Sequence, residues 1–386
     1  MSKAEALFKE FNKNYKAELF TVGTSIHNCE RIPFSSPRAN YMLYGGIPLG
    51  RITEFSGEEG SGKTTSSIDI AANAQKMFEE DWNKKIQYYE SLPKLNKEQS
   101  TQLLELRERG PLKIFWVDCE NTFDEQWARI FGLDVSKMYY MSPESQSAEE
   151  IFEMIVQVID TGEIGLCIID SLGMMVSQQE MEKTIEDATY GGISRALTKF
   201  SKKVETVCAR TNCALIGINQ VRDNLNAGYG GPTTVTPGGR CWKHVCSVRL
   251  QFRQGTPFDE DFKDVKKSHE NPYGHKVQIH VLKTKVCKPD RKVGFYTLTY
   301  DKGIIPLVDI IDIAITKDII HKGGAGWFTF IDTDTGELIC RQDEDGNSVE
   351  VKVQGQPNIL PFLQKPENSD ILEMIEKYVN RFIYNK

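Results

Sequence analysis

The sequence predicts an α/β protein in which helices cover both faces of a doubly wound, mostly parallel sheet. One observation is the order of strand, glycine loop and helix: residues 52–56 alternate apolar and polar side chains, 57–64 are rich in glycine, and 66–78 carry apolar residues at helical spacing. Another is a set of short apolar runs, at 113–118, 164–170 and 213–218. Strands that alternate with helical patterns in this way build a parallel sheet with helices on both faces.

Three parts are expected along the chain. Residues 1–35 form an N-terminal helix and linker, 36–304 form the core, and 305–386 form a small C-terminal α/β domain. Within the core, 79–112 is expected to be a surface insertion of two short helices broken at Pro93.

The later part of the chain is predicted to be rich in antiparallel strands. Strands expected at 245–253, 275–283 and 292–300 extend the parallel sheet with an antiparallel portion. In the C-terminal domain, the turn signals 334–336 and 345–347 predict a hairpin within 326–353.

Composition narrows the class of protein. The net charge of −7 argues against a general polyanion binder. Basic side chains nevertheless cluster at 195–210 and 263–292, and these clusters are either local binding surfaces for polyanions or simply solvated faces. No stretch approaches 18 apolar residues, so we expect no membrane partner and a cytoplasmic protein.

The nine cysteines include two pairs with equal spacing, and reduced structural cysteines are favoured over a zinc site.

The most informative stretch is Gly57–Thr64, which fits the pattern G-x-x-x-x-G-K-[ST] between a strand and a helix. Its glycines let backbone N–H groups converge on phosphate oxygens, and the following helix adds the positive end of its dipole. Lys63 can reach the β- and γ-phosphates, and the Thr64 hydroxyl can ligate Mg²⁺. The predicted nucleotide-binding residues of this segment are Gly57, Glu58, Glu59, Gly60, Ser61, Gly62, Lys63, Thr64 and Thr65.

Two carboxylates complete the predicted site. Asp170 ends an apolar run, and a strand end of this kind lies on the ligand side of a parallel sheet, where it can hold Mg²⁺ through water. Glu120 lies on the same side as Asp118 and beyond the strand end, where a carboxylate can polarise an attacking water. A helix cap at Asp170 and a plain surface acid at Glu120 are the alternatives.

Taken in order, these motifs resemble the RecA family of recombinases. The matching segments are GRITEFSGEEGSGKTT (50–65), WVDCENTFDEQWARIFGLD (116–134), CIIDSLGMM (167–175), INQVRDNL (218–225) and TTVTPGGR (233–240). Replicative helicases share the first motifs of this order but usually lack the last. The resemblance implies a RecA-like P-loop ATPase core, and its distance from bacterial members favours a bacteriophage protein of the UvsX kind.

For the nucleotide, the resemblance implies ATP with Mg²⁺. Glu120 would activate water, Gln220 would sense the γ-phosphate, and Asp124 and Trp127 would lie against the adenine.

The resemblance also implies assembly. Lys283 and Lys285 would reach the ATP of a neighbouring protomer and act like arginine fingers, and the N-terminal helix would dock on the next protomer. The result would be a helical filament.

For DNA, the resemblance implies two loops, 178–195 and 221–240. The second loop is rich in glycine because it would order only around a DNA strand, held by backbone N–H groups. The implied DNA-binding residues are Arg195, Arg222, Gly238, Gly239 and Arg240.

Several residues depart from the family pattern. Glu58 replaces the usual proline of the glycine loop, which would loosen it, and His244 replaces an aromatic residue at the protomer interface, which puts filament cooperativity in question. The insertion 79–112 has no counterpart in the compact bacterial pattern.

The sequence therefore predicts a DNA-dependent ATPase that acts as a recombinase. It would polymerise on single-stranded DNA and pair it with homologous double-stranded DNA in recombination and repair, with single-strand-binding and loader proteins as further partners. A ring-forming helicase-like repair ATPase, a metabolic kinase and a non-catalytic recombination mediator are the alternatives.

Overall fold

The computed structural model describes residues 3–15, 29–182, 192–223, 234–343 and 346–384. The chain forms two compact units, Met1–Glu30 and Arg31–Lys386. The described part of the first unit consists of the helix α1 (Lys3–Tyr15) and residues 29–30. The central segments of both predicted DNA loops, 183–191 and 224–233, and the turn residues 344–345 lie outside the described residues.

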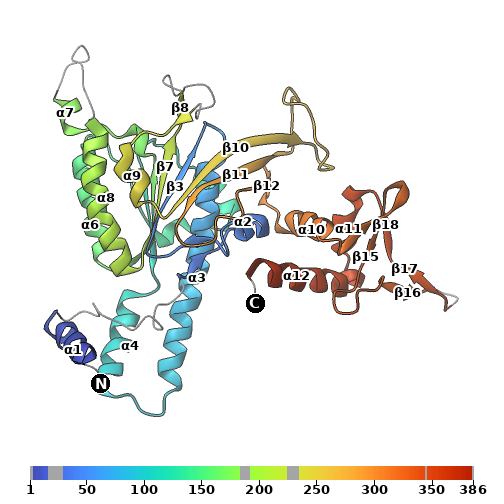
Figure 1. Ribbon diagram of the computed structural model, residues 1–386, viewed down its shortest axis with the longest axis horizontal. Helices are drawn as coiled ribbons and strands as arrows, with labels where there is room; N and C mark the ends of the chain where they lie inside the picture. Colours follow the sequence, from blue (N-terminus) through green and yellow to red (C-terminus); the bar gives the residue numbers. More distant parts are fainter. Residues whose placement is uncertain (1–2, 16–28, 183–191, 224–233, 344–345, 385–386) are drawn as a thin grey trace. The chain divides into compact units, whose positions relative to one another are not determined.

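The second unit is built on a mixed, mostly parallel sheet, which confirms the predicted fold class (Figure 1). Within the described residues its nine strands are, in spatial order, β13 (Gly303–Ile304), β12 (Val293–Thr299), β11 (Gly274–Thr284), β10 (Val248–Phe258), β3 (Ile52–Gly57), β7 (Ala214–Gln220), β6 (Ile164–Asp170), β4 (Lys113–Asp118) and β5 (Met138–Met141). The strands from β10 to β5 are parallel, whereas β11, β12 and β13 continue the sheet antiparallel. The predicted antiparallel extension is confirmed for 275–283 and 292–300, whereas the strand expected at 245–253 corresponds to β10, which is parallel to β3.

Two apolar cores lie on the two faces of this sheet. On one face pack α2 (Pro37–Met42), α3 (Lys63–Ser91) and α5 (Glu125–Ile130). On the other face pack α6 (Ala148–Asp160), α8 (Gly192–Thr211) and α9 (Gly239–Val245). The strands are buried on both faces, which explains why they read as continuous apolar runs in the sequence.

Two small antiparallel pairs accompany the sheet. β1 (Arg31–Ile32) pairs with β2 (Ile47–Pro48), and β8 (Arg222–Asp223) pairs with β9 (Thr234–Val235). A short helix, α7 (Gln178–Met181), precedes α8.

The helix after the glycine loop is longer than predicted. α3 runs for 29 residues, so the first of the two helices expected in the insertion is a continuation of α3. The segment 79–91 contains no glycine or proline, and nothing in it ends a helix. The break at Pro93 is confirmed, because α3 stops at Ser91 and α4 (Lys97–Arg109) begins after a capping box on Asn96.

α3 and α4 lie side by side as a helical arm that extends away from the sheet (Figure 1). The Trp82 indole donates a hydrogen bond to the Leu106 carbonyl at 2.8 Å, and Leu103 is buried between the helices.

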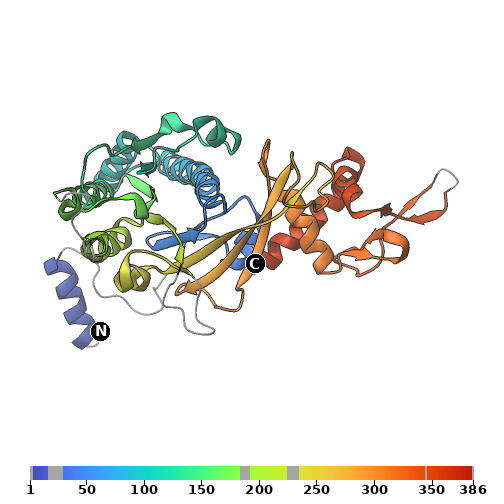
Figure 2. The ribbon, with the colours of Figure 1, turned by 90° about the horizontal axis from the view of Figure 1, so that it is seen from above.

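The C-terminal segment forms a third apolar core beyond the β13 edge of the sheet (Figure 2). It holds α10 (Pro306–Thr316), β14 (Ile320–Lys322), β15 (Trp327–Phe330), β16 (Cys340–Gln342), β17 (Ser348–Glu350), β18 (Lys352–Gln354), α11 (Ile359–Leu363) and α12 (Ser369–Tyr384). The predicted hairpin is two nested pairs, β15 with β18 and β16 with β17. Tyr41 of α2 stacks on Phe382 of α12 at a centroid distance of 4.8 Å.

Among the helices of the described ranges, none combines the length and the apolar character that crossing a bilayer requires.

Candidate functional site

The glycine loop has the backbone conformation that its sequence predicts. Gly62 caps the N-terminus of α3 with φ of 93°, in the left-handed region that favours glycine. At Gly57, a β-carbon would lie 2.5 Å from the Phe252 carbonyl oxygen of the neighbouring strand β10, so only glycine fits there. The loop therefore leads from β3 into the N-terminus of α3, a site suited to anions.

Lys63 is the first residue of α3 and is buried. Its ammonium group donates hydrogen bonds to the carbonyl oxygens of Gly57 at 3.0 Å and Glu58 at 2.6 Å. Burial lowers the pKa of Lys63, and the nearby carboxylates of Asp170 and Glu120 oppose that shift. A compact positive charge thus lies on the glycine loop.

Thr64 and Asp170 meet as predicted. The Thr64 hydroxyl donates to the Asp170 carboxylate at 2.8 Å. Burial raises the pKa of Asp170 to about 6; the Thr64 hydrogen bond and the charge of Lys63 lower it, while Glu120 and Asp118 add to the increase. A hydroxyl beside a buried carboxylate is a hard oxygen donor set, which suits Mg²⁺.

The loop that carries Glu120 is shaped by Asp118. The buried Asp118 carboxylate accepts backbone N–H groups from Glu120 at 3.1 Å, Thr122 at 3.0 Å and Phe123 at 2.9 Å. It also accepts the Tyr140 hydroxyl at 2.9 Å, and burial together with this carboxylate raises the pKa of Tyr140 to about 12. Asp118 therefore fixes the turn, and Glu120 projects from it.

Glu120 and Gln220 come together across the ends of β4 and β7. The Gln220 side-chain amide donates to Glu120 Oε1 at 3.2 Å, and the Ser171 hydroxyl donates to the same oxygen. Because β6 lies between these strands and ends at Asp170, three predicted residues meet at one edge of the sheet.

A cavity of about 420 Å³ opens beside the glycine loop. It is lined by Gly60, Ser61, Gly62, Lys63, Thr64, Thr65, Trp127, Gln254, His275, Leu298 and Tyr300. Its size is within the range of small-molecule sites. Trp127, which the resemblance implied would lie against the adenine, lines this cavity, and its indole N–H lies 3.4 Å from the Thr65 hydroxyl. Asp124 instead caps α5, where its carboxylate accepts the backbone N–H of Trp127 at 3.0 Å, and it does not line this cavity.

The cavity contains residues that sequence reasoning missed. His275 is 5% exposed; its Nδ1 lies 3.0 Å from the Tyr300 hydroxyl, and its Nε2 is buried with no hydrogen-bond partner among the described residues. Burial lowers the pKa of His275, which favours the neutral imidazole. No motif marks these positions, since they come from antiparallel strands remote from the glycine loop in sequence.

Lys283 and Lys285 lie together, but not at this cavity. Lys283 Nζ donates to the carbonyl oxygens of Lys243 at 2.6 Å and His244 at 2.8 Å, and Lys285 Nζ donates to that of His244 at 2.7 Å. Both lysines therefore satisfy carbonyl groups at the C-terminus of α9 within the single chain.

The described ends of the two predicted DNA loops are neighbours. A β-carbon at Gly239 would lie 3.8 Å from Ser194 Cβ, next to Arg195 in the first turn of α8. Gly238 has φ of 103° and Gly239 has φ of 72°, so both need glycine. Arg195, Arg222 and Arg240 are exposed. These cations lie at described ends of the two loops, on α8, β8 and α9.

No disulfide joins the cysteines of the described residues. Burial raises the pKa of the Cys213 and Cys246 thiols, which keeps them in the protonated form that does not ligate metal. Among the described residues, no group of three or more His, Cys, Asp or Glu side chains is arranged to hold a metal ion. A metal at the glycine loop would therefore rely on Thr64, Asp170, water and the phosphates themselves.

Comparison with known proteins identifies the family. The model of the RecA N-terminal domain matches residues 100–305, more than half of the chain. The chain belongs to the RecA family. It is 30% identical over 335 residues to Protein RecA of Aquifex aeolicus (87% of this chain and 78% of the relative) and 31% identical over 323 residues to that of Aquifex pyrophilus (83% and 79%). Protein RecA of Treponema denticola is 28% identical over 362 residues, covering 94% of this chain and 72% of the relative.

Membership of the RecA family settles the general function predicted from the sequence. The chain is an ATP-dependent recombinase of DNA recombination and repair, with DNA-dependent ATPase activity. As in the RecA family generally, it binds nucleotide with a divalent metal, binds DNA and forms filaments. These relatives are bacterial, and the bacteriophage origin stays a prediction.

Proposed function

We propose that this RecA-family chain hydrolyses Mg²⁺-bound ATP at the cavity beside the glycine loop, with Glu120 as the water-activating carboxylate. The observation that carries the proposal is the hydrogen bond between Gln220 and Glu120 at 3.2 Å, one strand away from the Thr64–Asp170 pair. It joins the predicted γ-phosphate sensor to the predicted catalytic carboxylate.

The residues present fit ATP and Mg²⁺. Lys63 and the N-terminus of α3 supply positive charge for the phosphates, and the remainder of the cavity can hold a nucleoside. Thr64 would ligate Mg²⁺ and Asp170 would hold it through water. When bound, the ion supplies charge neutralisation on the phosphate oxygens.

Glu120 would polarise the attacking water. The hydroxyl of Ser171 and the amide of Gln220 both donate to one of its oxygens, which holds the carboxylate at the sheet edge and leaves Oε2 for the water. Gln220 would exchange its bond to Glu120 for one to the γ-phosphate, and so report the nucleotide to segment 221–240.

The base end of the cavity would lie against Trp127, His275 and Tyr300. Asp124 would contribute by capping α5 and thereby placing Trp127. Nucleobases offer both donors and acceptors, so the free Nε2 of His275 can find a partner there.

The active site would be completed between protomers. Lys283 and Lys285 would exchange the carbonyl groups of α9 for the phosphates of the adjacent protomer's ATP, and α1 would dock on that protomer. We likewise propose that the chain divides into residues 1–35, 36–304 and 305–386, with the first part serving contact between protomers.

DNA would bind along the filament axis through segments 178–195 and 221–240. Arg195, Arg222 and Arg240 would contact phosphates, and Gly238 and Gly239 would allow close approach of the backbone. Homologous duplex DNA would be tested by base pairing, and single-strand-binding and loader proteins would assist in the cytoplasm.

The test is ATP hydrolysis at low salt, with and without single-stranded DNA, over a range of protein concentrations. Stimulation that rises cooperatively with protein concentration is expected, since assembly would complete the site. A rate indifferent to DNA would contradict the proposal and favour a kinase, and negligible turnover in all conditions would favour a mediator. Closed rings in electron micrographs with ATP and DNA would favour the helicase-like alternative.

A further inference from the structure

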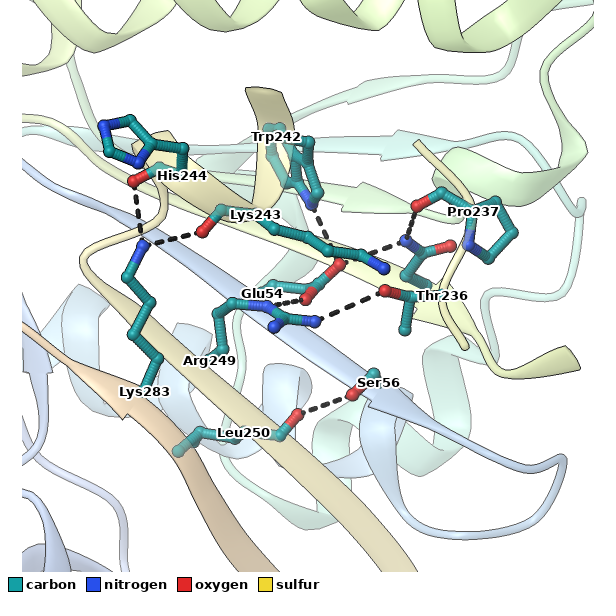
Figure 3. Close-up of polar contacts among 11 residues, drawn as sticks. Glu54, Ser56, Thr236, Pro237, Trp242, Lys243, His244, Arg249, Leu250 and Lys283 are labelled. Carbon is teal, nitrogen blue, oxygen red and sulfur yellow. Dashed lines mark hydrogen bonds and ion pairs between the residues drawn. The ribbon is translucent and has the colours of Figure 1, made fainter. Parts of the chain in front are cut away.

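A buried polar network connects the strand that carries the glycine loop to segment 221–240 (Figure 3). At its centre is the Glu54 side chain on β3, which is fully buried. Glu54 Oε1 accepts the Trp242 indole N–H at 3.0 Å and the Asn219 amide at 3.1 Å. Glu54 Oε2 accepts the Arg249 guanidinium at 2.5 Å. One carboxylate thus holds three donors from three elements, β7, α9 and β10.

Two of these donors extend the network to the end of the segment. The Asn219 amide also donates to the Pro237 carbonyl at 3.0 Å, and Arg249 donates to the Thr236 hydroxyl at 3.3 Å (Figure 3). The start of the segment is held as well. Asn219 directly precedes Gln220, the residue before the segment, and β8 near the start of the segment pairs with β9 further along it. Both described ends of segment 221–240 are therefore tied to Glu54.

The strand register explains why these side chains meet. Glu54 lies opposite Gly217 on β7 and Arg249 on β10. A β-carbon at Gly217 would lie 2.5 Å from the Trp242 ring, so the absence of a side chain there lets the indole lie on the sheet and reach Glu54.

Packing alone does not account for a charged pair in this place. Burying a carboxylate is expensive even when it is paired, and apolar residues of similar size often replace buried ion pairs without loss of stability. Asn219 adds to the cost, because its buried Oδ1 has no hydrogen-bond partner among the described residues.

We infer that Glu54 is a positioning residue that couples nucleotide binding to DNA binding. Glu54 lies on β3, three residues before Gly57, and holds the start and the end of segment 221–240 there. Phosphates sensed at Gln220 and DNA held by the segment therefore act on the same network. The inference rests on the proposed role of that segment in DNA binding.

The quantity to measure is the coupling factor, the ratio of the affinities for a single-stranded oligonucleotide with and without a non-hydrolysable ATP analogue. All three groups around the Glu54 carboxylate are donors, so the amide nitrogen of Glu54→Gln would face a donor and lose at least one contact. We expect the coupling factor to fall by about tenfold or more, while analogue affinity without DNA changes by less than about twofold. Coupling is reciprocal, so the increase in analogue affinity caused by DNA should fall equally.

Two further variants separate coupling from folding. Thr236→Val removes only the hydroxyl at the loop end and creates no unpaired buried charge, so it should fold and still reduce the coupling factor. Ser56→Ala is the matched control, since Ser56 donates to the Leu250 carbonyl at 3.0 Å between the same strands, β3 and β10, without contact to the loop (Figure 3). It should keep the coupling factor of the wild-type protein.

The outcomes are distinct. Wild-type coupling in both Glu54→Gln and Thr236→Val, or an equal loss in Ser56→Ala, would overturn the inference. If Glu54→Gln does not fold, Thr236→Val against Ser56→Ala decides alone. A wild-type protein in which the analogue does not alter DNA affinity would instead contradict the proposed function itself.

Discussion

Glu120 is the residue on which the proposed chemistry depends. Glu120→Gln keeps the size of the side chain but cannot polarise water, so steady-state ATP hydrolysis should fall by about 10²- to 10⁴-fold. Nucleotide binding and filament formation on single-stranded DNA should persist, as judged by equilibrium binding and electron microscopy. Glu125→Gln is the control, because Glu125 is an acid on the adjacent helix whose ion pair with Arg129 is exposed. A rate within about threefold of the wild-type rate would remove Glu120 from the mechanism.

The sequence predicted the residues of this site that stand in contiguous motifs. Lys63, Thr64, Glu120, Asp170 and Gln220 each lie at or after the carboxyl end of a strand, and parallel strands bring these ends together. The same reasoning could not reach Glu54 or His275. Glu54 reads as an ordinary alternating strand residue, and His275 reaches the cavity only because β11 continues the sheet antiparallel.

Among the elements, the positions of the strands were predictable and helix length was not. Apolar runs and acidic strand ends mark the parallel strands directly, whereas the end of α3 depends on a stop signal that does not come until Pro93. The contact between α10 and α2 was also unpredictable, since it rests on one buried carboxyl group. Asp309 of α10 accepts a hydrogen bond from Ser36, the N-cap of α2, and is 1% exposed.

This contact predicts how pH affects stability. Burial raises the pKa of Asp309 from 3.8 to about 7, against the opposing effects of the Ser36 hydrogen bond and the Arg38 charge. Between these values the folded protein retains a proton that the unfolded chain has released, so the free energy of unfolding falls as the pH rises. Asp309→Asn removes this dependence. As the pH rises between these values, the free energy of unfolding of the variant should therefore increase relative to that of the wild type, by up to roughly 1.4 kcal/mol per pH unit.

Urea denaturation at pH 4.5, 6.0 and 7.5 measures this difference in unfolding free energy between Asp309→Asn and the wild type. The contributions of the other buried carboxyl groups cancel, because both proteins contain them. Asp332→Asn provides a control without this dependence, because the backbone N–H groups of Thr335 and Asp334 lower the pKa of Asp332 and leave it ionised in both the folded and the unfolded protein over this range. Curves for Asp309→Asn and wild type that stay parallel over this range would show that Asp309 is ionised in the folded protein.

For the whole molecule, the fold and the family follow from the order of motifs, but the completion of the active site by a neighbouring chain stays a prediction. Lys283 on β11 and Lys285 directly after it donate to carbonyl groups of α9 and do not line the cavity. Two explanations compete: the lysines serve only to satisfy the C-terminal carbonyl groups of α9, or they leave these groups for ATP bound to a neighbour. Only assembly distinguishes them.

Lys283→Ala decides between these explanations through its dependence on protein concentration. If Lys283 acts across the interface, ATP binding by the dilute protein should stay normal, while DNA-stimulated hydrolysis should lose about 10³-fold at concentrations where the wild-type protein assembles. Lys276→Ala is the control, because Lys276 lies on the same strand and pairs with Asp264 at 2.8 Å, so it removes the same charge remote from α9. A lysine that only caps α9 would give a variant with a lower melting temperature and an undiminished rate per assembled protomer. That result would place catalysis within the single chain, because the cation removed would then have contributed nothing to the neighbour's ATP.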